Sequence, residues 1–263
     1  MPPATEDLFD RYVEGPPSSQ NAVDALPGWC TALPKETGAV AGALTLTQDH
    51  RIIWMLEALG SIDGWHILEL GPLDGGHTAM LHGAGAGRID AVEANKLAFL
   101  RCLVSKNLLG LDRATFHLGD VTQGLGSADK QFDLIVASGI LYHLSDPGAL
   151  LTALAARTNR LFIWTHVYDT AAMPKHDPRH SAFTGAGTEV EHQGLRMRLH
   201  VRRYHGSEQD PRFCGGPRDA HVWMERADLL ELLRRLGFDR IRIAHDDPGA
   251  PGGPALSILA ERS

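Results

Sequence analysis

The chain has 263 residues, of which 43% are hydrophobic and 22% charged, and its formal net charge at pH 7 is −7. This composition indicates a globular chain, and the acidic balance argues against coating of nucleic acid, so we expect no nucleic-acid partner. The three cysteines lack a CxxC spacing, and neither a signal sequence nor a run of about 18 apolar residues occurs, so we expect a cytoplasmic protein without a disulfide framework, a metal or a membrane span.

Residues 1–46 are rich in turn-forming residues, and we expect them to form an N-terminal extension that wraps the core or covers a site. A short helix is predicted for DLFDRYVE, residues 7–14. The domain proper, residues 47–263, is predicted to begin with an amphipathic helix over residues 47–60. Thr47 is its expected N-cap and Gly60 its expected end.

From residue 66 onward, short apolar segments alternate with helical segments. This alternation is typical of a mostly parallel, doubly wound α/β sheet. Strands are predicted at 66–71, 88–94, 114–120, 132–140 and 160–167, and helices at 77–85, 96–110 and 147–158. The run FDLIVASGI (132–140) is almost continuously apolar, which predicts a central strand buried on both faces.

The alternation stops at residue 168, and residues 168–222 are too long for a plain loop, so we expect an inserted substrate lid there. RMRLHVRRYH (196–205) favours a strand with a basic face. We expect this to be a solvated charged strand; the alternative is a face that holds a substrate carboxylate or phosphate. A helix is predicted at 224–238. Two strands, 239–247 and 255–263, are expected to form an antiparallel pair at one edge of the sheet.

The segment Glu69-Leu-Gly-Pro-Leu-Asp-Gly-Gly76 predicts a strand that runs through a tight glycine turn into a helix. Glycine has no side chain, so a ligand can approach the backbone of such a turn closely. A dinucleotide fingerprint needs glycine at the middle position, where this chain has Leu73, and a nicotinamide-dependent oxidoreductase is therefore disfavoured.

Three further sets of polar or small residues follow predicted strands. Glu93 comes 22 positions after Gly71, close to the spacing of an acid that binds ribose hydroxyls. Asp120 ends the third strand and can accept a hydrogen bond from an adenine amine. Ser138 to Leu144, SGILYHL, follows the fourth strand. Since ligands bind at the carboxyl ends of strands in open α/β sheets, these groups predict one shared ligand site.

The segments LELGPLDGGHT, AVEAN, LGD and FDLIVASGILYHLSDP resemble the successive motifs of class I methyltransferases that use S-adenosylmethionine (SAM), over about residues 64–167. ASGILYHLSDP and VWMERADLLELLRRLGF are similar to the branch that contains the tRNA wobble-uridine carboxymethyltransferases and many uncharacterised bacterial methyltransferases. The resemblance implies a Rossmann-like seven-stranded sheet with an antiparallel last strand, and SAM as the cofactor. The residues it implies for cofactor binding are Glu69, Gly71, Pro72, Leu73, Asp74, Gly75, Gly76, Glu93, Ala94, Asp120, Val121, Ser138 and Gly139.

Methyl transfer requires an aligned nucleophile and, for many acceptors, a base that removes a proton. His143 and His166 both follow strands, and we predict His143 as the base, with Tyr142 orienting the substrate. The alternative is that His143 only packs the loop. We predict methyl transfer to an oxygen or nitrogen of a small molecule; the alternatives are a tRNA- or protein-modifying enzyme and a SAM-binding protein without catalysis.

Overall fold

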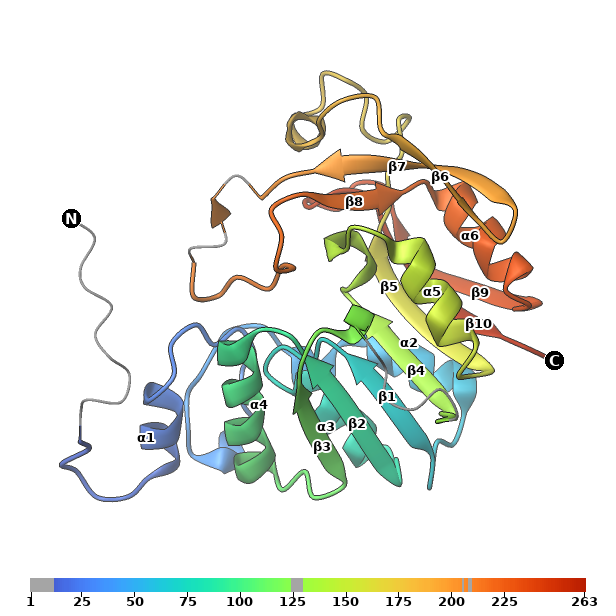
Figure 1. The fold of residues 1–263 in the computed structure, drawn as a ribbon. Coiled ribbons are helices and arrows are strands. Elements are labelled where there is room, and N and C mark those ends of the chain that lie inside the picture. Colours follow the sequence, from blue (N-terminus) through green and yellow to red (C-terminus); the bar gives the residue numbers. More distant parts are fainter. Residues whose placement is uncertain (1–11, 124–129, 205, 208–209) are drawn as a thin grey trace.

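The computed structural model describes residues 12–123, 130–204, 206–207 and 210–263. Its centre is a seven-stranded sheet in the order β3-β2-β1-β4-β5-β10-β9 (Figure 1). Strands β1 to β5 pair in parallel, and β10 lies antiparallel between β5 and β9. The bounds are β1 His66–Leu70, β2 Arg88–Glu93, β3 Ala114–Leu118, β4 Leu134–Ser138, β5 Arg160–His166, β9 Arg240–Asp247 and β10 Ala255–Glu261. The predicted seven-stranded sheet with an antiparallel last strand is confirmed.

Helices cover both faces of this sheet. One buried cluster joins the sheet to α5 and α6, and a second joins it to α2, α3 and α4. The α-helices are α1 Ser19–Asp24, α2 His50–Leu59, α3 Gly76–Gly83, α4 Lys96–Leu109, α5 Pro147–Ala155 and α6 Arg226–Arg235. Short 3-10 helices are η1 Lys35–Thr37, η2 Leu46–Gln48, η3 Val121–Gln123, η4 Leu141–His143 and η5 Pro178–Ala182. In the described ranges no helix is both long and apolar enough to cross a membrane.

Side chains at the helix starts explain most of the helix boundaries. The Asn95 side chain accepts the N–H groups of Leu97 and Ala98 at the start of α4, and Gly110 ends α4 in a left-handed conformation. The prediction that Thr47 is the N-cap of α2 was wrong. The Asp49 carboxylate accepts the Arg51 N–H instead, so α2 begins at His50 and the residues before it form η2.

The insertion carries its own antiparallel sheet, formed by β6 Thr188–His192, β7 Leu195–Arg202 and β8 His221–Met224. Met197 and Leu199 on one face of β7 pack in the same buried cluster as α5 and α6. Since β8 includes Met224, α6 begins two residues later than predicted.

The outer face of β7 is an ion-paired surface. Arg198 pairs with Glu189 at 3.0 Å, and Arg196 lies 3.7 Å from Glu191, with all four side chains more than half exposed. The expected solvated charged strand therefore describes this face.

The N-terminal extension contains α1, which packs beside α4 and was not predicted (Figure 1). Most of the helix predicted at residues 7–14 lies outside the described residues, and the three that are described, 12–14, are not helical. Residues 27–46, which we name the N-terminal cover, run from α1 to η2. We name residues 210–217, which follow β7 within the insertion, the lid loop.

Candidate functional site

A cavity of about 290 Å³ opens at the carboxyl ends of β1, β2, β3 and β4. The chain order of the sheet reverses between β1 and β4, the position where open α/β sheets bind their ligands. The N-terminal cover contributes Leu44 and Leu46 to the lining, and the lid loop contributes Phe213 to Pro217. The cavity is therefore walled by the sheet edge below and by two covering segments.

The glycine turn after β1 lines one wall through Gly71, Pro72 and Leu73. Gly71, Leu73 and Gly75 all have positive φ angles, of 65°, 58° and 80°. Glycine adopts this conformation freely, but a leucine is strained in it. A side chain at Gly71 would place its Cβ 2.4 Å from the Ile140 side chain. Gly71 therefore has no room for a side chain beside Ile140.

Glu93, at the end of β2, faces the cavity from the next strand. Its carboxylate accepts the N–H of Leu73 at 3.2 Å and the N–H of Asn95 at 2.8 Å. Burial raises the pKa of Glu93, although these backbone N–H groups act to lower it. Glu93 therefore fixes the glycine turn and still offers carboxylate oxygens to a ligand.

Asp120 and Ser138 are the other polar residues that were predicted to bind the cofactor at the carboxyl ends of the strands. Asp120 follows β3, lines the cavity, and accepts the N–H and the hydroxyl of Thr122 with one carboxylate oxygen. The Ser138 hydroxyl at the end of β4 is buried beside Gly139 and has no partner within the described chain. An unpaired buried hydroxyl at a cavity wall is a group that a bound ligand would satisfy.

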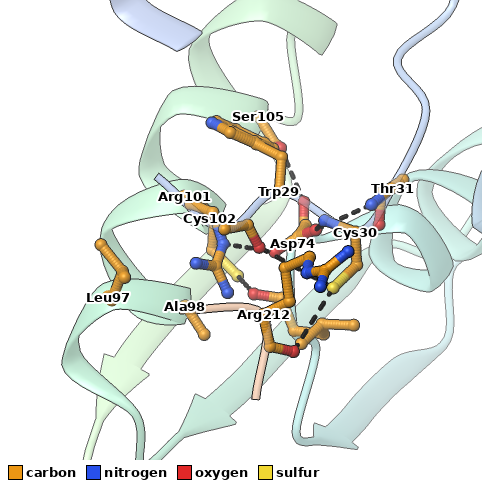
Figure 2. Close-up of polar contacts among 12 residues, drawn as sticks. Trp29, Cys30, Thr31, Asp74, Leu97, Ala98, Arg101, Cys102, Ser105 and Arg212 are labelled. Atoms are coloured by element: carbon orange, nitrogen blue, oxygen red, sulfur yellow. Dashed lines mark hydrogen bonds and ion pairs between the residues drawn. The ribbon is translucent and has the colours of Figure 1, made fainter. Parts of the chain in front are cut away.

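Four predicted cofactor residues lie outside the lining: Glu69, Asp74, Gly75 and Gly76. Glu69 is 1% exposed and accepts the hydroxyl of Thr78 at 2.6 Å, so it holds the start of α3 to β1. The Asp74 carboxylate accepts from Arg101 and from the N-terminal cover instead (Figure 2). The other nine, from Gly71 to Gly139, line the cavity.

Two side chains that the sequence did not reveal, those of Arg51 and His77, line the cavity beside the glycine turn. Both are held by Asp49: its carboxylate accepts from Arg51 Nε at 2.9 Å and contacts His77 Nε2 at 2.9 Å. Burial acts to raise the pKa of Asp49, but hydrogen bonds from Arg51 and His77 outweigh it and hold that pKa well below its usual range. The Arg51 guanidinium also lies 4.2 Å from the centre of the Trp164 ring. No spacing rule connects residue 77 to residue 49, so sequence reasoning had no signal for this cluster.

Of the predicted catalytic residues, Tyr142 and His143 line the cavity and His166 does not. His166 stacks on Trp223 with ring centres 4.9 Å apart, and its Nδ1 contacts the carbonyl of Gly253 at 2.8 Å. The prediction that His166 takes part in catalysis is corrected, because this ring packs between β5 and the insertion.

His143 has a partner from the insertion that the sequence did not indicate. The Tyr204 hydroxyl lies 2.6 Å from His143 Nδ1 and accepts the N–H of Gly216 at 2.9 Å. We assign Tyr204 as the donor to Nδ1, since its oxygen already accepts a backbone N–H. Burial, aided by the nearby His221 and His166, lowers the pKa of His143 to about 3. His143 is therefore neutral at pH 7, with its proton on Nε2.

The fold and the cavity define a Rossmann-like α/β domain with a ligand site at the point where the strand order reverses. Residues 68–158 match a family described as "Methyltransferase domain". A comparison with curated proteins found no match. The family match covers less than half of the chain and confirms the prediction of a methyltransferase domain over those residues.

Several solved structures are similar to this chain. The N-terminal domain of EvdMO1, crystallised in the presence of S-adenosylhomocysteine (SAH) and D-fucose, is 22% identical, with a TM-score of 0.71 and coverage of 93% of this chain and 95% of that one. In a further structure of EvdMO1 the match covers 46% of that chain. The 1,6-didemethyltoxoflavin-N1-methyltransferase of Burkholderia thailandensis, with SAH bound, is 18% identical, with a TM-score of 0.55 and coverage of 83% and 79%. Magnesium protoporphyrin IX methyltransferase of Synechocystis PCC 6803, with SAH bound, is 16% identical, with a TM-score of 0.52 and coverage of 81% and 80%. These likenesses confirm the predicted fold.

Proposed function

We propose that this protein is a SAM-dependent methyltransferase that acts on a hydroxyl or amine of a small molecule. One observation carries the proposal: a single cavity is lined by the glycine turn after β1, by carboxylates at the end of β2 and after β3, and by Ser138 at the end of β4, whose hydroxyl has no partner among the described residues. The match of residues 68–158 to a methyltransferase family and the neighbours with bound SAH support SAM as the cofactor.

The residues present fit an adenosine joined to an amino acid. Asp120 suits the adenine amine, Glu93 suits the ribose hydroxyls, and the turn at Gly71 leaves room for the amino-acid part. The Arg51 guanidinium suits a carboxylate, and the His77 ring nearby can donate a hydrogen bond to it. Bound SAM would supply an electrophilic methyl group.

The walls of the cavity support a small acceptor rather than RNA or a protein. The N-terminal cover and the lid loop both line the cavity. The enclosed space suits a cofactor and a small acceptor molecule. A net charge of −7 also disfavours an RNA substrate. The similarity of ASGILYHLSDP to the tRNA-modifying branch stays a prediction. We do not propose a tRNA substrate from it.

A second hollow, of about 340 Å³, adjoins the cavity and is our candidate for the acceptor site. The two share Leu44, Leu46, Arg51 and Trp164 in their walls. The hollow also contains His245, which has a φ angle of 48° where the pairing of β9 with β10 shifts register. Strained residues at bulges are often held in place for a function, so His245 is our candidate for a residue that contacts the acceptor.

The pKa of His143 changes the role that we propose for it. A base with a pKa of about 3 takes up a proton poorly at pH 7, so His143 is better suited to donate a hydrogen bond from Nε2 than to accept a proton. Tyr204 would keep the ring in this tautomer. We propose that alignment of the acceptor lowers most of the barrier and that His143 contributes to this alignment.

Calorimetry with SAH, SAM and NAD tests the cofactor. We expect SAH and SAM to bind wild type and NAD not to bind. Asp120→Ala should weaken SAH binding by about tenfold or more, the loss of one hydrogen bond to a charged group. Asp112→Ala is the matched control, because Asp112 is an exposed aspartate at the other end of β3. Absence of SAH and SAM binding to wild type would contradict the proposal.

Methyl transfer is tested by incubating the protein and SAM with small hydroxyl and amine compounds and measuring SAH formation. D-fucose belongs in the first panel, because the EvdMO1 domain was crystallised in its presence. SAH that forms only with an acceptor present supports an enzyme. Tight SAM binding with no transfer to any acceptor would instead favour a SAM-binding protein without catalysis.

A further inference from the structure

Asp74 in the glycine turn and Arg101 in α4 form a fully buried ion pair (Figure 2). Both side chains have 0% exposure, and Arg101 Nε donates to Asp74 Oδ1 at 2.6 Å. Neither residue lines the cavity. Buried charges are costly to desolvate, so a pair in this position needs a reason beyond contact with the ligand.

The Asp74 carboxylate joins the glycine turn to the N-terminal cover. Its Oδ2 accepts the N–H of Cys30 at 2.6 Å and the N–H of Thr31 at 2.8 Å. The Asp74 carbonyl accepts the hydroxyl of Ser105 on α4, which fixes the turn from behind. The cover then continues to Leu44 and Leu46 in the cavity wall.

Arg101 joins the same pair to both covering segments. Its Nη1 donates to the carbonyl of Pro27 at 3.0 Å and to that of Pro211, in the lid loop, at 3.5 Å. The two segments touch each other here: a Cβ on Gly28 would lie 2.1 Å from the Pro211 oxygen. The Cys30 thiol also lies 3.6 Å from the Arg212 carbonyl.

We infer that Asp74 and Arg101 are positioning residues that latch the N-terminal cover and the lid loop onto the glycine turn. This inference rests on the proposed function, because the cavity that the latch closes is the proposed cofactor site. Arg101 Nη2 is buried and has no partner among the described residues, so the closed arrangement leaves one donor unsatisfied. A closed state with this unmet donor is easier to open, as exchange of cofactor and product requires.

The test is a double variant, Asp74→Asn with Arg101→Met, in the full chain. It removes both charges together, so no lone buried charge remains to unfold the protein. We expect SAH to dissociate about tenfold faster in stopped flow. Hydrogen exchange should quicken at the Cys30 and Thr31 amides and in the lid loop, but not in β10. The control is Arg242→Met with Glu261→Gln, which removes an ion pair of 2.7 Å at the opposite edge of the sheet.

Gly28→Ala is a second route to the same result. A Cβ at Gly28 would lie 2.1 Å from the Pro211 oxygen and 3.0 Å from Arg101 Nη1, so the methyl group forces the N-terminal cover away from the lid loop while the charges of Asp74 and Arg101 are both kept. We expect faster SAH release here too. If wild type binds SAH and both variants release it at the wild-type rate with unchanged exchange in the covers, the latch is refuted. If wild type does not bind SAH, the proposed cofactor fails, while exchange in the ligand-free protein still decides the latch.

Discussion

At the scale of single residues, three non-glycine residues have positive φ angles among the described residues: Leu73, Gln193 and His245. Gln193 occupies the turn between β6 and β7, where such a conformation is ordinary. Leu73 and His245 line the cavity and the neighbouring hollow. Two of the three strained residues thus lie at the proposed site, which is where strain serves a purpose most often.

Leu73→Gly should relieve the strain in the glycine turn. A leucine in the left-handed region costs about 1 kcal/mol, so the variant should be more stable by up to that amount. SAH affinity should change by less than about threefold, because Leu73 contacts Glu93 through its backbone N–H. Urea unfolding and calorimetry measure the two effects. A large loss of SAH affinity would show that the Leu73 side chain itself contacts the cofactor.

His143→Gln separates alignment from proton removal. With a histidine pKa of about 3, turnover should show no inflection near pH 6.5, and the variant should lose roughly tenfold in kcat. The measurement is kcat against pH for wild type and variant with the acceptor found in the panel. A loss of about a thousandfold, with an acidic limb near pH 6.5 in wild type, would restore the role of general base.

At the scale of secondary structure, local sequence signals predicted the main sheet well. The continuous apolar run over 132–140 corresponds to β4, and Gly110 ends α4 as expected. The segments that were missed depend on distant partners. β8 is only four residues, HVWM, and is a strand because it pairs with β7. The same limit applied to the site. Groups at the ends of strands were found, whereas Arg51 and His77 in the cavity lining were missed. Tyr204 was missed too, because it meets His143 only through a tertiary contact.

The register shift of β9 against β10 carries a prediction at this scale. His245→Gly removes the side chain and the strain together, so stability should be unchanged or higher by about 1 kcal/mol. The KM for the acceptor should rise by about tenfold or more, with SAH affinity unchanged, if His245 contacts the acceptor. Gln193→Gly is the matched control, because it relieves a similar strain at a residue that does not line the hollow. Equal acceptor KM values in both variants would remove His245 from the site.

At the scale of the whole molecule, buried histidines should make stability depend on pH. Burial lowers the pKa of His143 in the folded state, whereas in the unfolded chain it returns to the ordinary value of 6.5. Below pH 6.5 the unfolded state therefore binds the proton and is favoured, and the stability from this group is lost by about 1.4 kcal/mol per pH unit. His166 and His221, whose pKa values burial also lowers, act in the same direction.

Urea unfolding at pH 7.5 and pH 5.5 checks this sign. Wild type should lose stability at the lower pH, and His143→Gln should lose less. The raised pKa values of Glu69 and Glu93 act in the opposite direction, since these folded-state carboxyls gain protons first as the pH falls. Because wild type and variant share them, the difference between the two proteins isolates His143. An equal loss in both would show that His143 is not buried in this way.

The position of β10 has a consequence for how the chain reaches this structure. All seven residues of β10 are buried, and the strand fills the space between β5 and β9. The insertion, α6 and β9 are all synthesised after β5 and before β10. During translation the edge of β5 that later pairs with β10 therefore has no partner strand, and this strand is largely apolar. Until β10 leaves the ribosome, the nascent chain presents a surface that attracts chaperones or other chains, and aggregation during synthesis is the failure to which this fold is most exposed.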